Sequence, residues 1–184
     1  MGGVACTAVV VAGAIAFFLI WIYNRLIAAR NLAREGFADI DVQLKRRADL
    51  VPQLVEAVKG YAAHEKALLT SVAELRSAAV AAKPGVDAGR FESERALGGK
   101  LKQLLLLQES YPQLKADANF RDLSQKLVDT EDHLQYARRF YNGAVKEYRN
   151  RLETFPDMIV ARLFGFQPLP FFETEDRNAV KVQL

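Results

Sequence analysis

The chain has 184 residues, of which 51% are hydrophobic and 26% are charged, and its formal net charge is +3. This length suits one domain plus an anchor and leaves no room for a second independent core. The small net charge, with no clustered basic face bearing stacking aromatic residues, argues against nucleic-acid binding. Because Cys6 is the only cysteine, no intramolecular disulfide and no cysteine-based zinc site can form.

Residues 4–23 form an almost uninterrupted apolar run without Asp, Glu, Lys or Arg. About 20 helical residues at ~1.5 Å each span the ~30 Å hydrocarbon layer of a bilayer. We therefore predict a transmembrane anchor over residues 4–23, with Trp21, Tyr23 and Arg25 at the membrane–water interface. The alternative is a cleaved signal peptide. That would require a basic start, a shorter apolar stretch and small residues at a cleavage site, where this chain has bulky residues from Phe17 onward.

Three arginines follow the apolar run closely, at positions 25, 30 and 34, whereas no basic side chain precedes it. Basic residues near the ends of a span favour the cytoplasmic side. We predict a short N-terminus outside and the body of the protein in the cytoplasm. The bias is modest and partly offset by Glu35, so a periplasmic body is the alternative.

The body, residues 24–155, is predicted to be all-α. Apolar residues recur there at steps of three and four, which predicts that the membrane helix continues into an antiparallel bundle of about four helices. Asp49 and Pro52 predict a helix restart, because aspartate caps free amides and proline is tolerated in a first turn. Gly60 is expected to weaken the following helix by ~1 kcal/mol relative to alanine without ending it. The breakers at 83–87 predict the turn of a helical hairpin.

Two further helices are predicted in the second half of the chain. The third ends at Pro112, and the fourth runs from about Ala118 to Phe155 with the regular spacing of a coiled coil or bundle. At ~1.5 Å per residue the fourth helix is ~55 Å long. Residues 156–184 form a tail whose aromatic part is expected to pack over the bundle; a partner-binding or membrane-touching patch is the alternative.

The two histidines, His64 and His133, are the first candidates for metal or acid–base chemistry. A carboxylate-bridged di-iron bundle needs a glutamate three residues before each histidine, and those positions hold Tyr61 and Thr130. Phosphate-binding glycine loops, paired zinc ligands and nucleophile elbows are also absent from the sequence. We predict no catalytic, cofactor or metal site, and no enzyme.

Three polar residues interrupt the apolar stripes: Arg30, Glu65 and Thr130. We interpret them as buried polar residues that set the alignment of the helices, with Glu65 paired to an arginine. The alternative is a small-ligand sensor with its site around Arg30 and Glu65.

The basic run at 45–47 is interpreted as a solvated face or as salt-bridge partners of nearby acidic residues. The acidic residues considered are Asp39, Asp41 and Glu56.

Four segments make the sequence resemble the LemA family over nearly its whole length. They are YNRLIAARN from Tyr23, IDVQLKRRADLVPQLVEAVKGYAAHEK from Ile40, YPQLKADANFRDLSQKLVDTED from Tyr111, and ARRFYNGAVKEYRNRLETFPDMIVARLFGF from Ala137. The resemblance implies one N-terminal membrane anchor and an antiparallel helical bundle, without established catalysis. Some relatives are linked to organising intracellular membrane compartments in magnetic bacteria, which implies a membrane scaffold by analogy.

Together these features predict a non-enzymatic scaffold or adaptor of the bacterial inner membrane. Its expected partners are the lipid bilayer and either further copies of itself or another membrane protein. No cofactor and no nucleic acid are expected. A small-ligand sensor, or an accessory factor for another membrane protein, is the alternative function.

Overall fold

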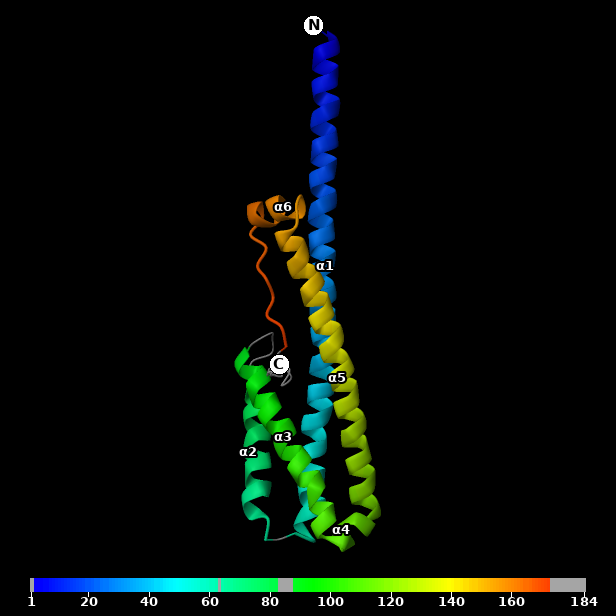
Figure 1. Ribbon diagram of the computed structural model, residues 1–184, viewed down its shortest axis with the longest axis vertical. Coiled ribbons are helices and arrows are strands. Elements are labelled where there is room, and N and C mark those ends of the chain that lie inside the picture. Colours follow the sequence, from blue (N-terminus) through cyan, green and yellow to red (C-terminus); the bar gives the residue numbers. More distant parts are fainter. Residues whose placement is uncertain (1, 63, 83–87, 173–184) are drawn as a thin grey trace, which may run out of the picture. The chain divides into compact units, whose positions relative to one another are not determined.

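A computed structural model describes residues 2–62, 64–82 and 88–172 (Figure 1). Within these residues the chain forms six helices and no strand, which confirms the predicted all-α class. The helices are α1 (Gly2–Lys59), α2 (Lys66–Ala81), α3 (Ala88–Ser110), α4 (Pro112–Ala116), α5 (Ala118–Glu153) and α6 (Asp157–Leu163). The hairpin turn predicted at 83–87 and the end of the tail, 173–184, lie outside the described residues.

The chain divides into two compact units. The first unit comprises residues 1–36 and 140–171, and the second comprises residues 37–139 and 172–184. Helices α1 and α5 contribute to both units. The division into an anchor, a bundle and a tail at residues 23 and 155 stays a prediction.

Helix α1 runs for 58 residues without a break, and Pro52 lies inside it. The predicted restart at Asp49 and Pro52 is therefore wrong. A proline within a helix leaves the carbonyl four residues earlier without its amide partner. Here that carbonyl belongs to Ala48, and it accepts a hydrogen bond from Arg76 Nε of α2 at 2.7 Å. A contact with the neighbouring helix thus compensates for the lost bond.

Helix α1 ends at Lys59 and α2 begins only at Lys66, so the expectation that Gly60 would not end the helix is also wrong. The backbone amides of Tyr61 and Ala62 both donate to Val58 O, at 3.0 and 2.8 Å, and close the last turn. Ala62 is then completely buried. The glycine alone weakens a helix only slightly, and the packing of the residues after it makes the reversal favourable.

The second unit is an antiparallel bundle of four helical segments, with α4 connecting α3 to α5 (Figure 1). Its segments are the C-terminal part of α1, then α2, α3 and the N-terminal part of α5. The predicted bundle is confirmed. The apolar stripes meet in one core, whose most buried members are Val51, Leu54, Val58, Val72, Leu97, Leu101, Leu104, Leu114, Phe120 and Leu127.

The ends of α3 and α5 follow the sequence signals closely. Helix α3 stops at Ser110, two residues before Pro112, as predicted. Helix α5 starts at Ala118, also as predicted, and Asp117 caps it: its Oδ1 accepts the Phe120 amide at 2.7 Å. This bond, followed by one from the Tyr61 hydroxyl, lowers the pKa of Asp117. Such caps favour the helix start because they satisfy a free amide.

The first unit joins the N-terminal part of α1 to the C-terminal part of α5, to α6 and to residues 164–171. Its core contains Ile22 and Leu26 from α1 with Val160 and Ala161 from α6. Helices α1 and α5 approach closely at Gly36, where a Cβ atom would lie 2.8 Å from the Phe140 ring and 3.2 Å from Tyr141 Cα. A side chain at position 36 would therefore push the two helices apart.

Residues 167–170 of the first unit lie along α5, held by two buried tyrosines. The Tyr141 hydroxyl donates to Pro170 O at 2.7 Å, and the Tyr148 hydroxyl donates to Gln167 O at 3.0 Å. Burial raises the pKa of Tyr141 to about 12 and also raises the pKa of Tyr148. The two hydroxyls satisfy carbonyls of a segment that has no helix of its own.

Candidate functional site

The most unusual residue of the second unit is Arg47, whose exposed fraction is only 1%. It stands three residues after Leu44 and four before Val51, so it occupies a position of the apolar stripe of α1. Lys45 and Arg46 are exposed, as the interpretation of a solvated face requires. For Arg47 that interpretation is wrong, and the spacing of its apolar neighbours is the signal that would have shown it.

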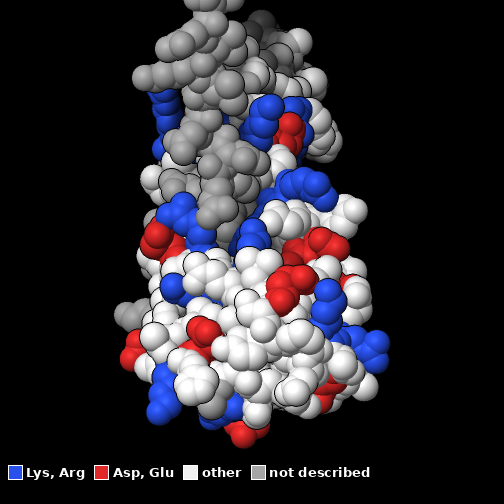
Figure 2. Space-filling model, turned by 60° about the horizontal axis from the view of Figure 1, so that its bottom comes forward, with Lys and Arg blue, Asp and Glu red and all other residues white. Residues whose placement is uncertain are grey.

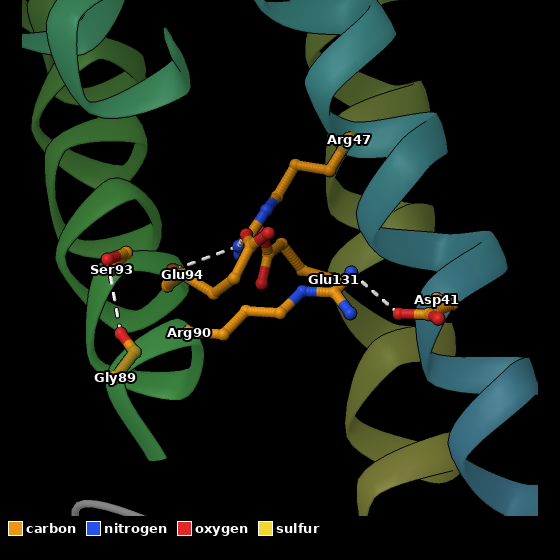
Figure 3. A network of polar contacts seen from close by, with 7 residues as sticks. All are labelled: Asp41, Arg47, Gly89, Arg90, Ser93, Glu94 and Glu131. Carbon is orange, nitrogen blue, oxygen red and sulfur yellow. Dashed lines mark hydrogen bonds and ion pairs between the residues drawn. The ribbon is translucent and has the colours of Figure 1, made fainter. Parts of the chain in front are cut away.

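Arg47 holds three helices together (Figure 3). Its Nη2 donates to the backbone carbonyl of Glu94 on α3 at 2.9 Å and also to the Glu94 carboxylate. Its Nη1 donates to Glu131 Oε1 on α5 at 3.0 Å. Its partners are thus neither Asp39, Asp41 nor Glu56, and both are distant from it in sequence. No local pattern connects Arg47 with Glu94 and Glu131.

A second ion pair completes this ion cluster. Arg90 Nη2 of α3 lies 2.6 Å from Asp41 Oδ1 of α1, one turn of α3 before Glu94 (Figure 3). The ion cluster of Asp41, Arg47, Arg90, Glu94 and Glu131 sets two guanidinium groups against three carboxylates. Arg47 and Glu94 are the two buried members, and removing either one would leave the other as an uncompensated buried charge.

The absence of a side chain at Gly98 leaves room for the guanidinium of Arg47. A Cβ atom at Gly98, one turn after Glu94 on α3, would lie 3.2 Å from Arg47 Nη1. Thr130, beside Glu131 on α5, is completely buried, and its hydroxyl donates to Lys126 O of its own helix at 2.7 Å. Because Arg47 of α1 donates hydrogen bonds to both α3 and α5, the ion cluster fixes the alignment of these three helices.

The other two polar candidates belong to different units, Arg30 to the first and Glu65 to the second. The half-buried Arg30 stacks its guanidinium over the ring of Phe166, 5.3 Å from the centroid. Glu65, also half-buried, accepts a hydrogen bond from the Tyr111 hydroxyl at 3.3 Å, where an arginine was expected. Burial, followed by the charge of Glu65, raises the pKa of Tyr111.

The predicted interface residues, Trp21, Tyr23 and Arg25, gather in the first unit. Trp21 is half exposed, and the Arg25 guanidinium lies 5.2 Å from its ring centroid. The Tyr23 ring meets Phe164 and Phe166 edge to face, with centroids 5.0 and 5.6 Å apart. Aromatic and basic side chains of this kind are typical of the headgroup region of a membrane.

The N-terminal part of α1 is long and apolar enough to cross a membrane. An 18-residue stretch in it has a mean hydropathy of 2.3, and only 6% of that stretch is buried. A core helix of a soluble protein would bury such a surface. The helix thus indicates single-pass membrane anchoring.

Neither histidine has a defined role in the structure, since His64 and His133 are both exposed. Among the described residues, no three His, Cys, Asp or Glu side chains gather in a way that could hold a metal ion. On the face turned forward in Figure 2, acidic and basic side chains are interspersed and neither sign dominates. This is the surface of an ordinary solvated bundle.

A transmembrane helix that continues into a bundle closed by a buried ion cluster defines a membrane-anchored helical-bundle protein. A family model described as LemA family matches residues 36–184. The chain therefore belongs to the LemA family.

Curated relatives of the chain include two magnetosome proteins. Magnetosome protein MamQ of Magnetospirillum gryphiswaldense is 22% identical over 174 residues, and magnetosome protein MamQ 2 of Paramagnetospirillum magneticum is 21% identical over 175 residues. Each match covers 82% of this chain and 64% of the relative. The chain thus spans less than two thirds of the length of these proteins.

Proposed function

We propose that the protein is a non-enzymatic scaffold or adaptor of the bacterial inner membrane, which acts through helix-mediated self-assembly or by binding another membrane protein. The observation that carries this proposal is the sharing of Arg47 between Glu94 and Glu131. The charges inside the bundle hold three helices in one alignment, so they serve rigidity and positioning. A rigid helical body on a membrane anchor suits a scaffold.

The outer face of α5 offers a surface for such assembly. Val128, Asp132 and Tyr136 follow one another at four-residue steps, so they share one face of the helix, and all three are exposed. The Arg139 guanidinium lies 4.5 Å from the centroid of the Tyr136 ring and adds a positive charge beside it. Aromatic and arginine side chains of this kind are enriched at protein interfaces.

Crosslinking in intact membranes tests the proposal. In a Cys6→Ser background, Val128→Cys and Tyr136→Cys each place a single thiol on this face. A thiol-reactive crosslinker should then give a covalent dimer or a reproducible adduct with one membrane protein. Lys102→Cys, at an exposed position on α3, is the matched control. A chain that stays monomeric and without a reproducible neighbour would overturn the proposal, and a copurifying small molecule in its place would favour the sensor.

The orientation is part of the same proposal: the body faces the cytoplasm, supported by the arginines at 25, 30 and 34. Protease added to intact spheroplasts should leave the body undigested until the cells are lysed. Digestion without lysis would place the body in the periplasm and restrict its partners to that side.

A role in membrane organisation is the most specific part of the proposal. It is supported by membership of the LemA family and by the two relatives named as magnetosome proteins. Identification of the crosslinked partner tests this part of the proposal, because a protein that shapes or organises membranes is the expected neighbour.

A further inference from the structure

The short helix α6 carries an apolar face that the protein leaves uncovered. Ile159 and Leu163 lie one turn apart on α6 and are 52% and 72% exposed, and two phenylalanines flank the helix: Phe155 before it is 70% exposed and Phe164 after it is 58% exposed. Four large exposed apolar side chains on or next to one short helix differ from apolar residues scattered singly over a surface, and such a concentration marks a candidate interaction site.

The position of α6 within the first unit indicates what covers this face. On its other side, Val160 and Ala161 pack against Ile22 and Leu26 of α1, next to the last residues of the apolar run. The exposed Phe164 also touches Tyr23, the residue at which that run ends. In Figure 1, α6 lies across the end of α5 and beside α1. The uncovered face is thus continuous with the base of the transmembrane span.

The charged side chains around α6 are also arranged as expected for a helix at the membrane surface, beside the base of the transmembrane span. Asp157, the acidic residue of its first turn, is buried, and its Oδ2 lies 3.6 Å from Arg25 Nη2. The basic residues remain accessible: Arg162 in the last turn is exposed, and the Arg25 side chain is 42% exposed. Phosphate groups of lipids attract such arginines, whereas a carboxylate at the same depth would be repelled by them.

We propose that α6 is an interfacial membrane helix: Ile159 and Leu163 on its uncovered face, with Phe155 and Phe164 at its two ends, insert at the boundary between headgroups and acyl chains. Apolar faces of interfacial helices enter a bilayer by ~5–10 Å, and the arginines beside them contact the headgroups. The first unit then touches the membrane at two places, the span and α6, and this fixes its tilt and rotation. The inference rests on membrane anchoring and not on the scaffold role.

Fluorescence quenching in vesicles tests this placement. In the Cys6→Ser background, Ile159→Cys and Leu163→Cys are labelled with an environment-sensitive fluorophore and the full chain is reconstituted, at a low protein-to-lipid ratio, in phosphatidylcholine with a minority of phosphatidylglycerol. Lipids that carry a nitroxide near the headgroup should quench both labels at least about twofold more than a label at Leu32→Cys, as expected for insertion at the interface. Leu32 is a matched control because it is exposed on α1 in the same unit, about 16 Å beyond Trp21 along the helix axis.

Two further measurements distinguish the possible outcomes: quenching by iodide, which reaches only labels in water, and quenching of a label within the transmembrane span. A label at Phe18→Cys reports anchoring itself, so quenching there with none at 159 and 163 would overturn the inference while anchoring stands. Labels at 159 and 163 that iodide quenches as strongly as the label at 32 would place the face in water. Labels shielded from both quenchers would mean that protein covers it. Ile159→Asp, with unchanged helix content, should move the label at 163 from lipid-quenched to iodide-quenched.

Discussion

In each unit a buried charged side chain lies between two side chains of opposite charge, and the sign of the buried charge differs between the two units. In the second unit, the cation Arg47 lies between Glu94 and Glu131 and donates hydrogen bonds to both carboxylates. In the first unit, the anion Asp157 lies between Arg25 and Arg151, at 3.6 and 3.7 Å. Among the described residues, Asp157 Oδ2 accepts no hydrogen bond.

The helices of the two units are held in alignment by different contacts. Arg47 bonds to α3 and α5 from α1, so its ion cluster determines how three helices meet. The first unit relies on the aromatic contacts of Tyr23 and on the buried hydroxyls of Tyr141 and Tyr148, which bind the backbone of residues 167–170. The two ion pairs of Asp157 are longer than those of Arg47, and the Arg25 side chain is 42% exposed, so solvent screens its attraction to Asp157.

The largest effect is expected from Arg47→Met, which keeps an unbranched side chain but removes the charge. Glu94 would stay buried without a counter-charge, and breaking a buried pair in this way costs about 3–5 kcal/mol. Chemical unfolding of the full chain in detergent micelles, followed by helix content, should show this loss in free energy of unfolding.

Two variants show whether that loss comes from the unpaired charge. Arg46→Met changes an exposed neighbour and should alter the free energy of unfolding by less than about 0.5 kcal/mol. Arg47→Met combined with Glu94→Leu removes both buried charges and should recover much of the loss, since apolar replacements of a buried ion pair are often tolerated. A double variant as unstable as the single one would show that the ion cluster acts through packing alone.

A smaller effect, in the first unit, is expected from Tyr141→Phe. The phenyl ring fills the same space but leaves Pro170 O without its donor, which costs about 1 kcal/mol. The pH dependence has a definite sign. Burial raises the pKa of folded Tyr141 to about 12 from an ordinary value of 10.0, so its contribution is fully present below pH 10 and is lost as pH rises from there to about 12.

Unfolding curves between pH 9 and pH 11 should therefore show a steeper loss of stability in the wild type than in Tyr141→Phe, because only the wild type carries this titration. Tyr136→Phe, at an exposed position on the same helix, is the control and should follow the wild type. Parallel curves for wild type and Tyr141→Phe would contradict the role assigned to this hydroxyl.

Much of the fold follows from local patterns in the sequence. Apolar steps of three and four identify the helices, and Pro112 and Asp117 mark the boundaries of α3 and α5, because these signals act within one turn. The errors at Pro52, Gly60 and Arg47 share a different cause. Arg76 satisfies the carbonyl that Pro52 frees, Ala62 is buried in the core, and Glu94 and Glu131 hold Arg47. The spacing of its apolar neighbours indicates that Arg47 is buried, but its partners, like the contacts at Pro52 and Gly60, involve segments distant in sequence, which no local spacing identifies.

The smallest effect is expected from Asp157→Asn, which tests whether the long ion pairs of Asp157 contribute little to the stability of the first unit. The substitution keeps the shape of the side chain and removes two attractions, each worth at most about 1 kcal/mol because the arginines are partly exposed. It also weakens the interaction of the side chain with the N-terminus of α6, worth about 0.3–1 kcal/mol. These losses are offset by a gain: the neutral asparagine removes the cost of burying a charged carboxylate whose Oδ2 accepts no hydrogen bond from the described residues.

The free energy of unfolding should thus change by less than about 1 kcal/mol. Glu153→Gln, at an exposed position on α5, is the control and gives the effect of removing a carboxylate from this unit. A loss of free energy of unfolding as large as that of Arg47→Met would mean that a buried charge also stabilises the first unit. That result would contradict the difference between the two units described above.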